Sequence, residues 1–374
     1  MKAPSQPFSR RSFLLQASRL GAFYGAARML PLPAMAEALA GDPRVAETPL
    51  VDKGFAMVRQ IGKGIYATIS DRTKGLTTRS NGGIIIGRDA AFLIEGFQTP
   101  QGAAFQMEAL RMVAPLPVRA AINTHFHYDH SLGNSFYGAN GVAVWAHAKA
   151  ASRIMETYPR MQATDRATFL APWQKRVREA KTDSARQHAQ SDIEGLTGMF
   201  DPVNQFVLSL PNHPLDPAKM PMSFDLGGLT VAIETYLGHT DTDIIIRVPE
   251  QNVVFTGDLL VNAQYPTNIN GEPTPWRATL AKFASFDKDT LFVPGHGQVC
   301  GQEGVALMRS IFDDISGQAE KLHKAGVPLD EAVERYVVPA AWKNFRMFSW
   351  GFCIGRTFAQ FYTEWGTPSK PLSY

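Results

Sequence analysis

Four side chains that bind transition metals fall within six consecutive residues of the stretch Thr124-His125-Phe126-His127-Tyr128-Asp129-His130. His125 and His127 are two apart, so on extended or turning backbone both imidazoles can reach one ion. Asp129 and His130 follow at once and can turn towards a second ion, and Zn²⁺ accepts both imidazole and carboxylate ligands. An apolar run at 118–123 predicts a buried strand, and residues 131–134 predict a turn and a helix start. We therefore expect a metal site on the loop after a strand; the alternative is a histidine-rich surface loop.

Three further candidate ligands, His239, Asp258 and His296, each follow a predicted strand and have a glycine beside them. The strands expected before them cover residues 229–235, 252–256 and 290–294. Taken singly, a histidine at such a place is more often structural and an aspartate more often a helix or turn cap. Their repeated position at strand ends is the stronger signal, because glycine permits tight backbone next to an ion.

The remaining pattern predicts alternating strands and helices. Further strands are expected at 64–70, 84–87, 91–95, 141–147, 222–226 and 244–248, and helices at 101–114, 164–181 and 301–324. Residues 149–200 are richer in charge and predict either a helical excursion on the surface or a lid over a substrate pocket. The aromatic-rich stretch 345–365 predicts a helix packed on the core, with a dimer contact or a pocket wall as alternatives. Tyr265 and Trp276 are candidates for lining the pocket.

Composition indicates a soluble globular protein with many loops, and the expected partner of its predicted metal site is a small-molecule substrate. The chain has 374 residues, of which 45% are hydrophobic and 19% charged, and beyond the first 40 residues no apolar run has transmembrane length. Residues 1–40 carry five basic residues against one acidic residue, so the formal net charge of +3 becomes −1 for the rest. Nothing in this balance favours a nucleic-acid partner.

The first 40 residues resemble an export signal. Ser9-Arg10-Arg11-Ser12-Phe13-Leu14-Leu15 is similar to the twin-arginine signal, and residues 34–36 and 38–40 are similar to small-x-small cleavage sites. We expect the twin-arginine machinery to export the chain to the periplasm or another exported location; the alternative is a retained amphipathic helix. Cys300 and Cys353 would then meet oxidising conditions, and whether they form a bridge is open.

The motifs His-x-His-x-Asp-His, Gly-His-Thr, Thr-Gly-Asp and Gly-His-Gly together resemble the metallo-β-lactamase superfamily, over about residues 55–300. The resemblance implies an α+β fold, a four-layer αββα sandwich with a dinuclear site at one edge. We expect this domain to span residues 41–324 with a helical insertion at about 149–222, and an aromatic-rich helical extension at 325–374.

The resemblance also implies which residues bind two Zn²⁺ per chain. The first ion would be held by His125, His127 and His239. The second would be held by Asp129, His130 and His296, and Asp258 would bridge the two. An aspartate at 258 is similar to the glyoxalase II, lactonase and sulfatase-like branches, since true lactamases carry cysteine there or lack the bridge. Activity on β-lactams is therefore expected at most as a side reaction.

The expected function is hydrolysis of an ester, lactone, thioester, amide or related bond by a hydroxide that bridges the two ions. Asp129 would bind metal, orient this hydroxide and take part in proton transfer. One alternative is an iron-dependent oxidoreductase on the same fold, although the flavodiiron branch carries Glu where this chain has His127. The other is a non-catalytic periplasmic metal-binding or maturation factor. Substrate identity and oligomeric state do not follow from the sequence.

Overall fold

The computed structural model describes residues 42–368, and within them the chain forms two β-sheets that pack face to face. The predicted signal sequence and its cleavage sites lie outside the described residues. In the first sheet the strands neighbour one another in chain order. They are β1 (Val51–Asp52), β2 (Ala56–Gly62), β3 (Ile65–Ser70), β4 (Gly82–Ile86), β5 (Ala91–Ile94), β6 (Val118–Ile122), β7 (Val144–His147) and β8 (His213–Leu215). β1 to β5 are antiparallel neighbours, and β5 to β8 are parallel.

The second sheet has the order β13-β12-β11-β10-β9. Its strands are β9 (Met222–Asp225), β10 (Thr230–Thr235), β11 (Ile244–Val248), β12 (Val253–Val261) and β13 (Leu291–His296). β9 to β12 are antiparallel, and β12 pairs with β13 in parallel, with register shifts around Gly257. Such register shifts mark bulges, at which β12 bends after Phe255.

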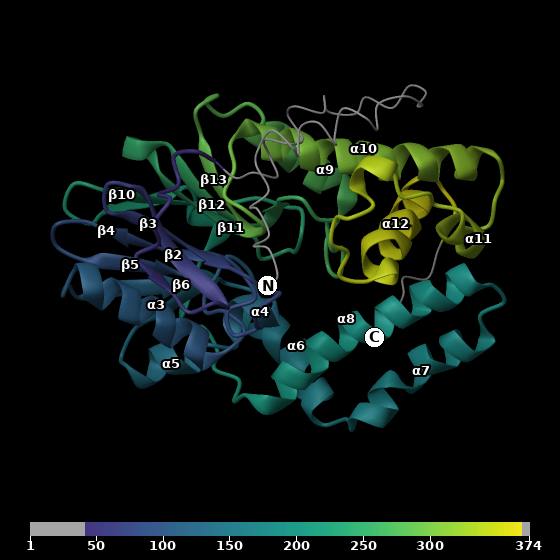
Figure 1. Cartoon of the computed structure of the whole chain (residues 1–374), viewed down its shortest axis with the longest axis horizontal. Helices are drawn as coiled ribbons and strands as arrows, with labels where there is room; N and C mark the ends of the chain where they lie inside the picture. Colours follow the sequence, from purple (N-terminus) through teal and green to yellow (C-terminus); the bar gives the residue numbers. More distant parts are fainter. Residues whose placement is uncertain (1–41, 369–374) are drawn as a thin grey trace, which may run out of the picture.

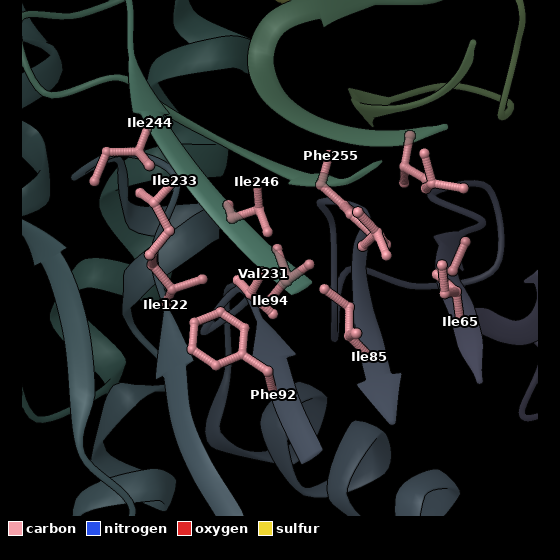
Figure 2. Packing of buried hydrophobic residues seen from close by; sticks show 14 of the residues in the cluster. Ile65, Ile85, Phe92, Ile94, Ile122, Val231, Ile233, Ile244, Ile246 and Phe255 are labelled. Carbon is pink, nitrogen blue, oxygen red and sulfur yellow. The ribbon is translucent and has the colours of Figure 1, made fainter. Parts of the chain in front are cut away.

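The core between the sheets consists of the inward-facing apolar residues of both, as Figure 2 shows. Ile65, Ile85 and Phe92 of the first sheet face Val231 and Ile246 of the second (Figure 2). All five are fully buried. Burial of such a side chain stabilises the fold by about 1.5–3 kcal/mol, so this layer fixes how the two sheets lie on each other.

Helices cover the outer face of each sheet (Figure 1). α3 (Pro100–Val113) and α5 (Asn134–Ala139) pack on the first sheet, and α9 (Pro273–Phe283) and α10 (Gln302–Lys324) pack on the second. Thr99 caps α3, since its side chain accepts a hydrogen bond from the Gly102 amide and Pro100 is the first helical residue. The layers are therefore helix, sheet, sheet, helix, which confirms the predicted αββα sandwich.

Two helical groups lie beside the sandwich (Figure 1). The first is α6 (Ala150–Gln162), α7 (Arg166–Glu179) and α8 (Asp183–Gln205). The second is α11 (Leu329–Glu334), a π-helix at Gly351–Gly355 and α12 (Arg356–Glu364). Each group has its own apolar cluster, and Phe348 packs against both clusters. The predicted domain boundaries stay predictions, but these groups occupy the stretches named as insertion and extension.

Some local expectations were wrong. β12 does not end at Thr256 but continues to Val261, so Asp258 lies within a bent strand and not after it. The aromatic stretch becomes helical only from Gly351. The strand β2 was missed because the adjacent polar residues Arg59 and Gln60 interrupt its apolar residues, so the segment shows neither strict alternation nor a continuous apolar run.

Two further features concern the cysteines and the membrane. Cys300 and Cys353 are both free and buried, so they do not form a disulfide bridge with each other. Within residues 42–368, no helix combines the length and the apolar character needed to cross a membrane.

Candidate metal centre

The loop after β6 carries four of the predicted ligands. Its backbone changes from extended to helical within the motif. His127 is still extended, and the short helix α4 (Tyr128–Ser131) begins at the next residue. Asp129 and His130 therefore lie on a helical turn, and the His130 ring packs against the His125 ring with centroids 4.1 Å apart. The Asn123 side chain holds the loop closed, since its amide donates to the His130 carbonyl oxygen over 2.8 Å.

Three imidazoles converge on one point. Nε2 of His125 lies 3.1 Å from Nδ1 of His127, and Nε2 of His239 lies 2.9 Å from the same nitrogen. Three imidazoles bound to one tetrahedral Zn²⁺ at about 2.0–2.1 Å would have nitrogens about 3.3 Å apart. The spacing of this first triad is therefore close to that of a zinc site.

The second triad is Asp129, His130 and His296, and Asp258 lies between it and the first. Ligand atoms of the second triad all lie within 4.8 Å of one another. Oδ1 of Asp258 lies 3.3 Å from Nε2 of His130, and Oδ2 lies 3.2 Å from Nε2 of His296 and 3.5 Å from Nε2 of His239. One carboxylate thus faces imidazoles of both triads, as a bridging ligand must.

The outward ring nitrogens fix which nitrogen of each histidine faces the centre. His127 Nε2 donates to Asn270 Oδ1 over 3.0 Å, and His296 Nδ1 donates to the Arg79 carbonyl oxygen over 3.2 Å. His125 Nδ1 lies 3.1 Å from Thr124 Oγ1. With the proton on the outer nitrogen, the lone pair of the inner nitrogen points into the centre.

Two buried carboxylates brace the ligands, and the sequence alone did not identify either role. Glu95 Oε1 lies 3.1 Å from Nδ1 of His130, and both its oxygens accept from Thr124. Asp243 accepts from the amide and the hydroxyl of Thr240, over 2.8 and 2.6 Å, directly after His239. Burial raises the pKa of Asp243 to about 8 and also raises the pKa of Glu95. Asp241 instead points outward and pairs with Arg153 on α6.

Burial and neighbouring charges together set the protonation of the triads. Burial lowers the pKa of His125 well below its usual value and the pKa of His239 to about 3, so both rings are neutral donors of a lone pair. Burial opposes ionisation of Asp129, but His130, His296 and Arg79 outweigh it and lower the pKa of Asp129 to about 2. Burial opposes protonation of His130, but Glu95 and Asp258 outweigh it and raise the pKa of His130 well above its usual value. Metal binding at His130 must therefore displace a proton, whereas His125 and His239 are already neutral.

Two ligand atoms that face the centre lack a hydrogen bond of good geometry. Nε2 of His130 and Oδ1 of Asp258 are buried and lie 3.3 Å apart. Buried polar atoms without such a bond are costly in a folded protein, so this pair fits a site built for a cation. The structure brings all seven predicted residues together; their assignment as ligands stays a prediction that metal analysis tests.

Glycines allow the backbone to approach the centre closely. A β-carbon at Gly295 would collide with Asp258, and Gly257 has a positive φ of 51° and a backbone position at which a β-carbon would collide with Thr124. These contacts explain why glycine accompanies two of the ligand segments.

A narrow pocket opens beside the centre, with about 440 Å³ free of protein atoms and partly open to solvent. Besides five of the predicted ligands, it is lined by Arg72, Tyr128, Val261, Gln264, Tyr265, Thr267, Ile269, Arg346 and Phe348. Tyr265 lines the pocket as expected, whereas Trp276 packs against His239 with ring centroids 5.2 Å apart. None of the lining residues comes from 149–222. The end of β12, the loop after it and the segment before the π-helix supply most of the wall.

Arg79 connects the centre to the insertion, and nothing in the sequence spacing marked it. Its Nε lies 3.6 Å from Oδ2 of Asp129, and its Nη1 donates to the Gly198 carbonyl oxygen of α8 over 2.9 Å. Its φ is 62°, a conformation that L-residues rarely adopt. Such strain persists where surrounding contacts hold it, here the packing of Arg79 between a predicted ligand and a helix.

Comparison with known proteins agrees with this geometry. The model of the metallo-beta-lactamase superfamily matches residues 77–296, which is more than half of the chain and includes all seven predicted ligands. A linear primary-alkylsulfatase from Pseudomonas sp. (strain ATCC 19151) is 23% identical over 243 residues. That match covers 61% of this chain and 44% of the alkylsulfatase, so the chain spans less than half the length of this relative.

Solved structures include similar folds. A metallo-beta-lactamase from Pontibacter korlensis is 16% identical with a TM-score of 0.49, covering 69% of this chain and 98% of that one. A metallo beta lactamase from Erythrobacter litoralis is 17% identical with a TM-score of 0.46, covering 71% and 99%. At these TM-scores the likenesses add nothing to the family match.

Proposed function

The chain belongs to the metallo-beta-lactamase superfamily, and we propose that it is a hydrolase whose centre holds two Zn²⁺ ions. The observation that carries the proposal is the convergence of two ligand triads on the single carboxylate of Asp258. His125, His127 and His239 would hold one ion, Asp129, His130 and His296 the other, and Asp258 both. Imidazole and carboxylate ligands in this number suit zinc.

Bound zinc would supply Lewis-acid chemistry, polarising a substrate oxygen and making water a nucleophile near neutral pH. The residues of the chain do the positioning. Glu95 and Asn270 orient the imidazoles of His130 and His127, and Asp243 holds the loop that carries His239. With a pKa of about 2, Asp129 remains a carboxylate that accepts a hydrogen bond and orients a water, and it rarely keeps a proton.

The proposed reaction is cleavage of an ester, lactone, thioester, amide or sulfate ester. Sulfate esters are included because the curated relative is named an alkylsulfatase. An aspartate at the bridging position supports these classes above β-lactams, for which a side activity is proposed. The Tyr265 and Phe348 side chains give the pocket an apolar surface for an organic substrate.

A hydrolysis panel tests this function. Zinc-loaded protein is offered an aryl ester, an acyl-homoserine lactone, a glutathione thioester, a chromogenic cephalosporin and an aryl sulfate, beside the variant Asp258→Ala. We expect turnover of one class and its loss in the variant. An iron-dependent reaction or a non-catalytic role would instead leave all five uncleaved with zinc bound, and iron as the metal found in the purified protein would favour the oxidoreductase alternative.

We also propose export by the twin-arginine route to the periplasm, on the support of the Ser9–Leu15 motif. Replacing both Arg10 and Arg11 by lysine should leave the protein in the cytoplasm. Fractionation of cells that express either form measures this. Export of the double variant at the normal level would contradict the route.

A further inference from the structure

Two arginines, Arg72 and Arg346, line the pocket together with five of the predicted ligands, and both lie outside the stretch that the family model matches. Arg72 follows β3, and Arg346 lies before the π-helix of the C-terminal group. Gln264 joins them in space, because its backbone forms a parallel bridge with Arg346 and its side chain lies beside Arg72. The Tyr265 amide donates to the Arg346 carbonyl oxygen over 2.8 Å and holds the backbone of Arg346 beside that of Gln264.

The guanidinium groups of these two arginines are poorly partnered. Nε of Arg72 is buried without a hydrogen bond, and Nη1 has only a contact of 3.5 Å to Gln264 Oε1. Among the described residues, no carboxylate oxygen lies within 4.0 Å of the side-chain nitrogens of Arg72 or Arg346. Arg79 differs, since Gly198, Gln98 and Asp129 surround its guanidinium. Arg72 and Arg346 therefore keep unused donors at the pocket.

The charge at the pocket is not balanced by the protein. Asp129 and Asp258 are the acidic residues among those that line it, and both are predicted metal ligands. Burial and the nearby Arg79 and Arg346 lower the pKa of Arg72 to about 9, and burial with Arg79 lowers the pKa of Arg346. Burial and the neighbouring cations thus destabilise the charged form of each guanidinium. A bound anion would stabilise that charged form.

The rest of the pocket wall is suited to an organic group. Val261 and Ile269 are buried, and Phe348 lines the same space. An oxyanion at the arginines would leave its organic part against these apolar side chains. Arginine suits this role because its planar guanidinium forms paired, charge-assisted hydrogen bonds with carboxylate or sulfur oxyanions.

We propose that Arg72 and Arg346 form an oxyanion subsite, so that the substrate of this centre is an organic anion. The proposal rests on the proposed hydrolase function and narrows its substrate to molecules with a negatively charged group and an apolar part. That group is either the sulfur oxyanion that reacts or a carboxylate beside the bond that is cleaved. Both share the same chemistry at the arginines.

Calorimetric binding of three six-carbon probes tests the subsite without turnover: hexanesulfonate, hexanoate and hexanol. We expect zinc-loaded protein to bind at least one anion tenfold or more tightly than hexanol. A preference for hexanesulfonate indicates a sulfur oxyanion, and a preference for hexanoate indicates a carboxylate. Equal binding of all three probes, or no binding of either anion, would overturn the proposal.

Variants separate the arginines from the metal. Arg72→Gln and Arg346→Gln should each weaken anion binding about ten- to a hundredfold, the usual range for a lost charge-assisted hydrogen bond. The lysine variants should recover part of this loss and show that the pocket is intact. Arg277→Gln is the control, because Arg277 lies exposed on α9 and pairs with Asp313; it should change nothing.

Metal analysis of the same samples keeps the two proposals apart. Normal zinc content with unchanged anion affinity in the Arg72→Gln, Arg346→Gln double variant would mean that anions bind at the metals alone. The subsite would then be wrong and the hydrolase proposal would stand. Absence of zinc from the wild-type protein would contradict the hydrolase proposal, whatever the probes do.

Discussion

At the scale of single residues, the centre depends on side chains that touch the predicted ligands from outside. Glu95 is fully enclosed and has a positive φ of 79°, which few residues other than glycine adopt. Its carboxylate faces His130 on one side and Thr124 on the other. The backbone of Glu95 is thus held in an unfavourable conformation at a place where its side chain orients a ligand.

Glu95→Gln should weaken zinc affinity about ten- to a hundredfold, because the amide cannot hold the Nδ1 proton of His130 as a carboxylate does. Competition with a chromogenic chelator measures the affinity. Glu108→Gln is the matched control, since Glu108 is exposed on α3 and pairs with Lys53. Equal zinc affinity in the Glu95→Gln and Glu108→Gln variants would show that Glu95 does not support the metal centre.

The cysteines give a second prediction at this scale. Burial raises the pKa of Cys353 to about 11 and raises that of Cys300 as well. Only the thiolate reacts with a disulfide reagent, so neither cysteine of the native protein should react at pH 8, and both should react after unfolding without reductant. If unfolded protein shows no free thiol, the two cysteines are bridged and this part of the structure is wrong.

Sequence patterns could predict the ligands but not these supporting residues. His125 to His130, His239 and His296 follow strands that periodicity reveals, and a glycine lies next to the last two. Glu95 also ends a predicted strand, but its partner His130 is 35 residues away and only the parallel pairing of β5 with β6 brings them together. Arg79 and Arg346 had no motif at all, because their roles arise from packing between distant segments.

At the scale of elements, α8 holds the segment that supplies Arg346 and Phe348. Asp192 of α8 accepts from the Gly351 amide over 2.7 Å, and Ser191 accepts from the Trp350 amide over 3.0 Å. Gly195 lies under the same segment. The insertion therefore supports the pocket indirectly, by holding the C-terminal segment that lines it. The prediction of a lid at residues 149–200 did not include this indirect contact.

Gly195→Ala tests this route. A β-carbon there would lie 2.7 Å from the Phe348 carbonyl oxygen, a distance that real side chains do not tolerate, so the segment must shift. We expect a loss of about 1–3 kcal/mol in the free energy of unfolding and weaker binding of the anionic probe, with zinc content unchanged. Denaturant unfolding and calorimetry measure the two effects.

Gly317→Ala is the control for that variant. Gly317 lies within α10, and a β-carbon there meets nothing within 4 Å. Alanine should be neutral or stabilise the helix by up to about 1 kcal/mol. If Gly195→Ala behaves in the same way, α8 does not support the pocket.

At the scale of the whole molecule, the predicted ligands join both sheets at one edge of the sandwich. Four of them follow β6 of the first sheet, and the other three lie on or after β10, β12 and β13 of the second. The family match and the αββα layers establish the fold that makes this possible. Metal binding should therefore stabilise the pairing of the sheets as well as build the site.

Removal of metal by a chelator should lower the melting temperature, since a ligand that binds only the folded state at a thousand times its Kd adds about 4 kcal/mol. Scanning calorimetry with and without chelator measures the shift, and added zinc should reverse it. A melting temperature that does not respond to chelator or to zinc would mean that the centre does not tie the sheets together.

The most direct test of the dinuclear centre is the zinc content of the purified chain, measured by mass spectrometry of the metals beside Asp258→Ala. We predict about two zinc per wild-type chain and a clear loss in the variant, because the carboxylate of Asp258 faces imidazoles of both triads. One zinc or none per wild-type chain, iron in its place, or two zinc retained in the variant would contradict a centre bridged by Asp258.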